Sequence, residues 1–370
     1  MSFENIKKNF GFGCMRLAMT GDQVDHEETK KMVDYFLENG FNYFDTAHGY
    51  LGGQSEIAVR ECLTSRYPRE SYILTNKLSG YCFAHSEDIR PLFQQQLDAC
   101  GVDYFDFYLM HAQDKNNYPR YKAERAYEIS LELMAEGKFR HFGISFHDHP
   151  ELLDQILTEY PQIEVVQIQL NYADFDDPSV QSRKCLEVCR RHGKPAIIME
   201  PVKGGSLAKL PEEAQKVFDE LQGGSAASYA IRFAASQEGV MMVLSGMGSM
   251  EMMVDNVSYM KDFKPLNAEE TAAVQKVCEI FRNMGAIPCT ACRYCTEVCP
   301  QGIDIPELFA LLNSKKIWNN FNAFYYYNNI CTKEGTRARD CLKCGACEGI
   351  CPQHLNIREL LEEVSKEFDK

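Results

Sequence analysis

Cysteine spacing near the C-terminus constrains this 370-residue chain more than any other feature. Eight of its 16 cysteines form two copies of one pattern. The copies are Cys289, Cys292, Cys295 and Cys299 before Pro300, and Cys341, Cys344, Cys347 and Cys351 before Pro352. Each reads C-x-x-C-x-x-C-x-x-x-C-P. In a large chain outside a secretory context, such cysteines indicate metal ligands before disulfides.

The spacing favours iron over zinc. Iron–sulfur clusters are held by thiolates, and three cysteines separated by two residues each can hold three corners of a cubane from one turn of chain. Zinc is the alternative, because paired Cys-x-x-Cys units also bind zinc. Zinc needs four ligands, however, and leaves no role for the third evenly spaced cysteine or for the proline in both copies. The pattern therefore predicts two 4Fe-4S clusters.

The two runs resemble those of two-cluster ferredoxins, in which the last cysteine of each run binds the other cluster. This resemblance implies one cluster on Cys289, Cys292, Cys295 and Cys351, and the other on Cys341, Cys344, Cys347 and Cys299. Between the runs, residues 301–340 are longer than in short bacterial ferredoxins and have the apolar spacing of a helix. We therefore expect an α-helical ferredoxin-like domain, with the aromatic residues of 321–327 in its core or shielding a cluster.

Composition narrows the function classes. Hydrophobic residues make up 45% and charged residues 25% of the chain, which is typical of a globular protein. A net charge of -14 disfavours nucleic acid and anionic membranes as partners. Residues 1–13 lack a signal-peptide core, and no apolar run could span a bilayer, so we expect a cytoplasmic protein. The other eight cysteines share no ligand spacing and are expected to be buried small hydrophobes.

The first 260 residues alternate short apolar runs with amphipathic helical stretches, which predicts parallel strands joined by helices. The eight candidate strands are 10–14, 42–45, 72–77, 105–111, 141–145, 165–171, 195–201 and 241–245. Eight units in about 240 residues favour a closed (β/α)8 TIM barrel. For the first helix, Asp25 and Glu28 predict a capping box and Gly40 the end. We expect a barrel over 1–262, a linker helix over 263–287 and a two-cluster domain over 288–370.

Chemistry in such barrels lies at the C-terminal ends of the strands. Asp45, Lys77 and His111 each end a predicted strand, and Tyr50 follows the second. Each alone has a structural explanation: a helix cap, a packed ring, a solvated lysine or a core histidine. Together, the segments F-D45-T-A-H-G-Y50, I-L-T-N-K77 and Y-L-M-H111 resemble the catalytic tetrad of the aldo/keto reductases. The resemblance covers most of the barrel.

The resemblance implies a role for each residue in carbonyl reduction. Hydride arriving at a carbonyl carbon builds negative charge on the oxygen, which must be stabilised and protonated. Tyr50 would be the acid. A free phenol has a pKa of about 10, so a buried cation beside it is needed to favour the phenolate. Lys77 would supply that charge, Asp45 would hold Lys77, and His111 would orient the substrate oxygen.

By the same resemblance, a nicotinamide dinucleotide would lie across the barrel mouth. The residues implied are Gly13, Ser145, Gln167, Asn171, Met199, Gly246, Ser249 and Asn256. Met199 stands where an aromatic residue commonly stacks on the nicotinamide. The basic residues expected after the last strand are missing from S245-G-M-G248-S-M-E-M252. NADPH and NADH therefore both remain candidates, and a flavin is a further alternative; Lys203 is expected to be a solvated loop lysine.

The sequence thus predicts an oxidoreductase that reduces a carbonyl or related small-molecule substrate and exchanges electrons through two 4Fe-4S clusters, with a redox partner protein as a further candidate. The alternatives are an electron-transfer protein whose barrel binds flavin or a partner, and a redox sensor. Because a nicotinamide moves two electrons and a cluster one, coupled enzymes normally insert a flavin. No flavin motif is visible, and the four residues of the tetrad favour the reductase.

Overall fold

The computed structural model describes residue 3 and residues 5–221 and 223–370. Eight parallel strands close into a barrel in the order β1-β10-β9-β8-β7-β6-β5-β4. These strands are β1 (Phe10–Gly13), β4 (Tyr43–Asp45), β5 (Ile73–Leu78), β6 (Phe105–Gln113), β7 (Phe139–Phe146), β8 (Val165–Gln169), β9 (Ala196–Met199) and β10 (Val240–Ser245). The predicted TIM barrel is confirmed, and its strands differ from the prediction only at their ends.

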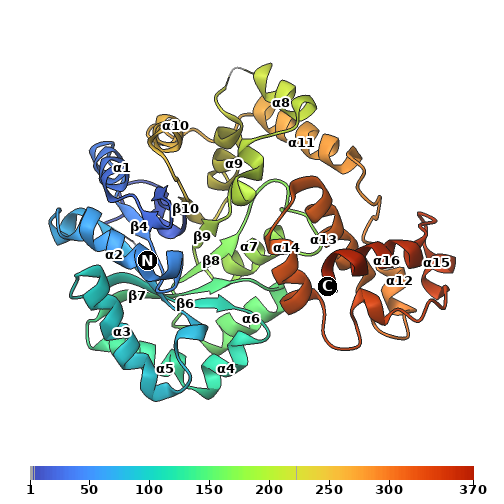
Figure 1. Cartoon of the computed structure of the whole chain (residues 1–370), viewed down its shortest axis with the longest axis horizontal. Coiled ribbons are helices and arrows are strands. Elements are labelled where there is room, and N and C mark those ends of the chain that lie inside the picture. The colour runs from blue at the N-terminus through green and yellow to red at the C-terminus, as the bar shows by residue number, and fades with distance from the viewer. Residues whose placement is uncertain (1–2, 4, 222) are drawn as a thin grey trace.

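Helices surround the barrel (Figure 1). They are α1 (His26–Glu38), α2 (Gln54–Val59), α3 (Ser86–Cys100), α4 (Asn117–Ala123), α5 (Ala126–Ala135), α6 (Pro150–Glu159), α7 (Ser182–Arg191), α8 (Glu212–Asp219), α9 (Ala226–Ala235) and α10 (Met250–Met260). Alternate strand residues face inward, and Phe107, Val165 and Ile197 are among those that form the barrel's inner core. A packed interior leaves the strand ends as the place for a binding site.

The first helix shows where local sequence rules hold and where packing overrides them. As predicted, the Asp25 carboxylate accepts from the backbone nitrogen of Glu28 at 2.9 Å, and Gly40 follows the helix with φ +82°. The reciprocal half of the predicted capping box is absent. The Glu28 carboxylate accepts instead from the backbone nitrogen of Met250 at 3.2 Å, at the start of α10. The β2 (Met19–Thr20) and β3 (Gln23–Val24) hairpin before α1 was not predicted.

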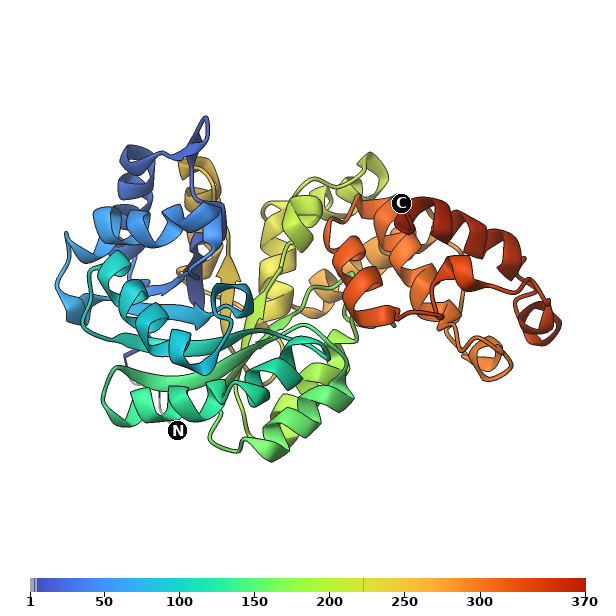
Figure 2. The same ribbon diagram turned by 60° about the horizontal axis from the view of Figure 1, so that its bottom comes forward.

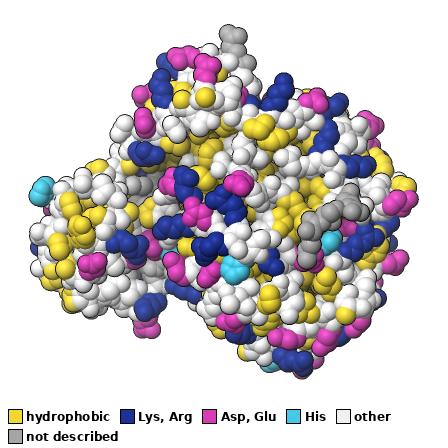
Figure 3. Space-filling model, turned by 180° about the vertical axis from the view of Figure 1, so that it is seen from behind, with side chains coloured by type: hydrophobic (Ala, Val, Ile, Leu, Met, Phe, Trp, Pro, Cys, Tyr) yellow, Lys and Arg dark blue, Asp and Glu magenta, His cyan; other side chains and the backbone are white. Residues whose placement is uncertain are grey.

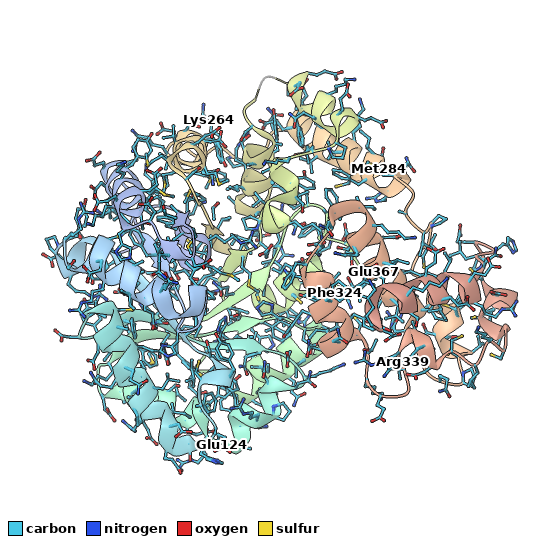
Figure 4. The ribbon with its side chains drawn as sticks, viewed as in Figure 1. Glu124, Lys264, Met284, Phe324, Arg339 and Glu367 are labelled. Atoms are coloured by element: carbon cyan, nitrogen blue, oxygen red, sulfur yellow. The ribbon has the colours of Figure 1, made fainter. Side chains whose placement is uncertain are left out.

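The C-terminal part of the chain is helical, as expected. Helix α11 (Ala268–Asn283) packs against α8 and α9 of the barrel, and Met284, labelled in Figure 4, follows it. The remaining helices are α12 (Tyr294–Glu297), α13 (Ile305–Trp318), α14 (Asn322–Tyr325), α15 (Ala346–Ile350) and α16 (Ile357–Phe368). Helix α12 contacts α15, and α13 contacts α16, so the domain repeats one unit of cysteine run, short helix and long helix. It projects from the barrel as a second lobe (Figure 2).

The two lobes meet through the aromatic residues of 321–327, which we expected in the core of the helical domain or beside a cluster. Tyr326 and Tyr327 are buried, but the Tyr325 hydroxyl donates to the Asp114 carboxylate at 2.5 Å, and the Tyr326 hydroxyl donates to the Gln169 side-chain oxygen at 3.3 Å. Asp114 and Gln169 belong to the C-terminal ends of β6 and β8. The label on Phe324 in Figure 4 marks this junction. The helical lobe therefore covers part of the barrel mouth.

Hydrophobic side chains are exposed on the surface of the smaller lobe, on the reverse face of the molecule (Figure 3). Exposed hydrophobic residues that lie between the cysteines of the two runs are Tyr294, Val298, Leu342 and Ile350. In the described part of the chain, every helix is too short or too polar to cross a membrane.

Candidate active site and cluster sites

A buried ion pair lies at the mouth of the barrel, between the neighbouring strands β4 and β5. The Lys77 ammonium donates to the Asp45 carboxylate at 2.6 Å and to the Thr46 carbonyl at 2.8 Å. The Gln167 amide donates to the other Asp45 oxygen at 3.2 Å. Burial lowers the pKa of Lys77, but the Asp45 carboxylate and the Tyr50 oxygen together raise it above its ordinary value. Lys77 is therefore a fixed cation inside the mouth.

Tyr50 faces this cation from the loop after β4. It begins the 3-10 turn η2 (Tyr50–Gly53), whose next three residues are left-handed: Leu51 has φ 54°, Gly52 64° and Gly53 92°. Left-handed backbone is costly at Leu51, and such strain is typical of segments that present a functional side chain. The Lys77 nitrogen lies 4.9 Å from the centroid of the Tyr50 ring. The loop thus holds the phenol against the ammonium.

The balance of charges keeps this phenol protonated. Burial raises the pKa of Tyr50 above its ordinary value, and the Lys77 ammonium opposes the rise without cancelling it. We expected Lys77 to lower the pKa of the phenol. Its charge does act in that direction, but the rise caused by burial is larger. A protonated phenol beside a cation is a proton donor that is stabilised once it has given its proton away.

His111 completes the group through an irregularity in β6. The pairing of β6 with β7 shifts register between Met110 and Gln113, and Ala112 in this bulge has φ 51°. Bulges re-aim side chains. The His111 ring lies 5.8 Å from the Tyr50 ring, edge to face, and its Nδ1 lies 2.6 Å from the Ser79 hydroxyl oxygen. Burial and the Lys77 charge place the pKa of His111 well below its usual range, so the imidazole is neutral.

A groove of about 1160 Å³ extends from the ends of β9 and β10. Gly246 and Asn256, two of the predicted cofactor residues, line it. The Asn256 amide donates to the Ser245 hydroxyl at 2.8 Å, which fixes its orientation. Ser249 caps α10 by accepting from the backbone nitrogen of Met252. A Cβ added at Gly13 would lie 3.4 Å from the Ser245 carbonyl oxygen, an ordinary contact distance, so Gly13 borders the end of β10.

The two basic residues of this groove come from segments that the sequence did not single out, and the acidic residues Glu200, Glu251 and Asp255 line it as well. Arg16, in the turn after β1, and Lys209, after β9, both line the groove, and an Arg16 nitrogen lies 3.3 Å from the Glu200 carboxylate. The prediction for Lys203 was wrong. Its side chain is buried and ion-paired with Asp174, because the loop after β9 folds it inward.

The other predicted cofactor residues lie in or just after β7, β8 and β9, and three of them make hydrogen bonds within the protein. Ser145 accepts from the backbone nitrogen of Ala112 at 3.4 Å, and Gln167 contacts Asp45. The Asn171 amide donates to Asp174 at 2.8 Å and to the Glu200 carbonyl at 3.1 Å. Asn171 would have to release these bonds to hold a carboxamide. Met199, at the end of β9, is half-buried.

The cysteines of the two runs gather around two hollows in the helical lobe. The first is lined by Cys289, Cys292, Cys295 and Cys351. The second is lined by Cys299, Cys341, Cys344 and Cys347. Each hollow thus brings together three thiols of one run and the last thiol of the other, which is a complete ligand set for a cubane. The residues present fit two 4Fe-4S clusters with exchanged fourth ligands.

The backbone of both runs is shaped in the same unusual way. Two residues of each run are left-handed at matching positions: Ala291 (φ 54°) and Arg293 (φ 67°) in the first, Lys343 (φ 55°) and Gly345 (φ 78°) in the second. Alternating left- and right-handed residues turn successive N–H groups toward one point, an arrangement found at iron–sulfur sites. The Lys343 nitrogen already donates to the Cys341 sulfur at 3.4 Å.

Sequence reasoning missed four groups that border these sites. Ser79 and His147 directly follow β5 and β7, so the strand-end rule could have found both. Arg16 lies three residues after β1, outside the strand-end positions inspected, and Tyr325 offered no such signal because it reaches the mouth from the helical lobe. Among the remaining cysteines, Cys14, Cys62, Cys100, Cys185 and Cys189 are buried as expected, whereas Cys82, Cys278 and Cys331 are only half-buried.

Relatives share the barrel at low identity. An uncharacterized oxidoreductase of Bacillus subtilis is 24% identical over 72% of this chain and 90% of its own length. The NADH-specific methylglyoxal reductase of Escherichia coli is 27% identical over 47% of this chain and 57% of its length. Among solved structures, the holo form of an aldo-keto reductase from Bacillus halodurans is 25% identical and covers 73% of this chain and 91% of its own, with a TM-score of 0.59.

Family models divide the chain in the same way as the fold. The model of the aldo/keto reductase family matches residues 9–279, and that of a 4Fe-4S dicluster domain matches residues 288–355. The chain is therefore an oxidoreductase of the aldo/keto reductase family that carries a 4Fe-4S dicluster domain C-terminal to its barrel.

Proposed function

We propose that this protein reduces a carbonyl group on a small-molecule substrate, with Tyr50 as the proton donor and a nicotinamide dinucleotide held in the groove beside β9 and β10. The observation that carries the proposal is the contact of Tyr50, Lys77, Asp45 and His111 at one point of the barrel mouth. The dinucleotide supplies hydride when bound. The rest of the chemistry belongs to these side chains.

Each side chain has one task in this scheme. Neutral His111, aligned by Ser79, donates a hydrogen bond that orients the carbonyl oxygen. Tyr50 protonates that oxygen as negative charge develops on it, and Lys77 stabilises the phenolate that remains. Asp45 keeps Lys77 charged and aimed. Arg16, in the groove, is suited to a phosphate of the dinucleotide, because guanidinium groups bind phosphate through paired hydrogen bonds.

NADPH is the first dinucleotide to test. An aldo-keto reductase from Klebsiella pneumoniae, 20% identical with a TM-score of 0.60, was solved in complex with NADPH. The relative from Escherichia coli is named as NADH-specific. The missing cations after β10 favour neither, so both dinucleotides belong in the assay.

We further propose that two 4Fe-4S clusters in the helical lobe exchange electrons with the barrel. Two one-electron clusters can together hold the two electrons of one hydride, whose proton would pass to solvent. Because a nicotinamide gives up both electrons at once, a flavin bound between the barrel and the clusters would have to divide them. Cys289, in the first hollow, also lines a cavity of about 560 Å³ whose other walls include Asp174 and Lys203 of the barrel. The first hollow therefore adjoins the barrel. Both hollows are lined by residues of the helical lobe alone. Exposed Leu342 is part of the lining of the second hollow, on the side suited to a redox partner.

Substitution of Tyr50 tests the carbonyl chemistry. In anaerobically purified protein, Tyr50→Phe should lower the rate of reduction of model aldehydes by at least about a hundredfold, since general acid catalysis contributes that much. Dinucleotide binding, measured by fluorescence titration, should stay unchanged. The matched control is Tyr104→Phe, just before β6 at the opposite end of the barrel, which should keep full activity. Full turnover by Tyr50→Phe would overturn the assignment.

Mixing the purified protein with NADPH or NADH, without substrate, tests the electron transfer. Loss of cluster absorbance near 400 nm on the time scale of turnover supports coupling between barrel and clusters. Unchanged absorbance together with normal aldehyde reduction would instead favour a structural or sensing role for the clusters.

A further inference from the structure

Three metal-ligating side chains converge between the barrel and the helical lobe, away from both the tetrad and the cysteine hollows. His149 precedes α6 of the barrel, Glu307 lies in the first turn of α13, and Cys331 ends η7 (Tyr326–Cys331). One ligand atom from each lies within 4.8 Å of the other two. We propose that His149, Glu307 and Cys331 bind one transition-metal ion, Zn²⁺ or Fe²⁺, that fastens the cluster domain to the barrel.

Burial argues that these groups need a ligand. Glu307 is 4% exposed. The Nε2 atom of His149 is buried and has no hydrogen-bond partner among the described residues. A buried polar atom without a partner is rare and costs free energy. A metal ion on Nε2 would remove that cost, and it would offset the negative charge that a thiolate and a carboxylate place in a poorly hydrated seam.

The donor set and its spacing suit these ions. One imidazole nitrogen, one carboxylate oxygen and one thiolate sulfur are the ligand types of zinc sites, and ligand atoms around tetrahedral zinc lie about 3.3–3.8 Å apart. His149 Nε2 and Glu307 Oε1 are 3.8 Å apart. Three protein ligands leave the fourth position for water. The donors therefore need only small side-chain shifts to close around an ion.

An arginine links this site to the first cluster run. Arg293, between Cys292 and Cys295, has a guanidinium nitrogen 3.5 Å from Glu307 Oε1 and also pairs with Asp304. Ligating carboxylates commonly accept such a second hydrogen bond, which orients them toward the metal. Without an ion, the same contact would leave Glu307 hydrogen-bonded within a group that includes a neutral Cys331 thiol. An experiment must therefore distinguish a bound metal ion from a hydrogen-bonded group without metal.

Metal content of the full-length holoprotein separates them. After incubation with one equivalent of zinc chloride and desalting under anaerobic conditions, we expect about one zinc per chain beside about eight irons. Cys331→Ser and His149→Ala should each lower retained zinc about tenfold or more while the iron content stays unchanged. Unchanged iron shows that the variants fold. Cys189→Ser, buried in α7 of the barrel, is the matched control and should retain zinc.

Zinc K-edge absorption spectroscopy identifies the ligands, because iron does not interfere at that edge. One sulfur and three nitrogen or oxygen neighbours support the site. Equal zinc in wild type and Cys331→Ser would overturn the site, as would a shell of four sulfurs, which would place the zinc in an empty cluster hollow. Failure to retain either zinc or an additional iron would overturn it too. The same experiment with ferrous iron tests the other metal. Wild type should then retain a ninth iron per chain, and Cys331→Ser should not.

Discussion

The Lys77 ammonium and the Asp45 carboxylate are both buried, so neither has water to replace its partner. Removing one charge leaves the other buried without a partner, which lowers the free energy of unfolding by about 3–5 kcal/mol in comparable buried pairs. We expect Lys77→Met to lower the free energy of unfolding by about that amount and to abolish carbonyl reduction. In urea unfolding experiments, the double variant Asp45→Asn/Lys77→Met should recover part of the stability and none of the activity. Equal stability of the two variants would contradict the ion-pair interpretation.

His147 gives the folded protein a defined response to acid. Burial lowers its pKa from 6.5 to about 4. Below pH 6.5 the unfolded chain therefore binds a proton that the folded chain does not, and stability falls as the pH drops toward 4. Between pH 7 and pH 5 the histidine should remove about 1–2 kcal/mol from the free energy of unfolding. His147→Asn should lose less stability than wild type over that interval in denaturant titrations; identical losses would show that His147 plays no part.

At the level of single residues, position in the fold was predictable where a local rule applied. Asp45, Lys77 and His111 lie at or near the C-terminal ends of strands, so the barrel rule places them at the mouth without coordinates. The effect of burial on Tyr50 was not readable, because the walls that desolvate the phenol come from several loops. Tyr325 was missed for a related reason: its approach to the mouth depends on the packing of the two lobes, which short-range patterns do not encode.

At the level of elements, alternating apolar runs gave the order and type of all eight barrel strands. The apolar runs did not predict the bulge at His111 and Ala112, although this bulge sets the direction of the histidine side chain. Glu28 shows the same limit, because a contact with α10 outweighed the local capping box. Regular elements follow from periodicity, whereas irregularities arise from neighbours that the sequence order does not place nearby.

The exchanged fourth ligands make a prediction about the two cysteine runs. Cys299 lines the hollow of the second run, so Cys299→Ala should damage the cluster held by Cys341, Cys344 and Cys347. The first hollow keeps all four of its thiols. Iron content should fall from about eight toward about four per chain, and the electron paramagnetic resonance signal of one reduced cluster should remain. Cys278→Ala, in α11, should keep the full iron content, and unchanged iron in Cys299→Ala would refute the ligand exchange.

At the scale of the whole molecule, the lobes are joined by polar contacts around the barrel mouth. The Lys115 ammonium donates to the Ile330 carbonyl at 2.5 Å and to the Thr332 carbonyl at 3.4 Å, and the Asn116 amide donates to the Asn329 carbonyl at 3.0 Å. Lys115 and Asn116 follow β6, the strand that carries His111. The position of the helical lobe is thus tied to the same strand end as the tetrad.

Removing these contacts should loosen the seam without disturbing the barrel. Each lost hydrogen bond is worth about 1 kcal/mol, so Lys115→Ala/Asn116→Ala should raise hydrogen-exchange rates in residues 323–332 about tenfold or more. Amides of the barrel strands should exchange as in wild type. Lys343→Ala, which loses only an ion pair with Glu362 within the helical lobe, is the control. If residues 323–332 stayed protected in the double variant, other contacts between the lobes would have to hold them together. The next contact to remove would then be the proposed metal ion on His149, Glu307 and Cys331. Adding His149→Ala to the double variant would remove it.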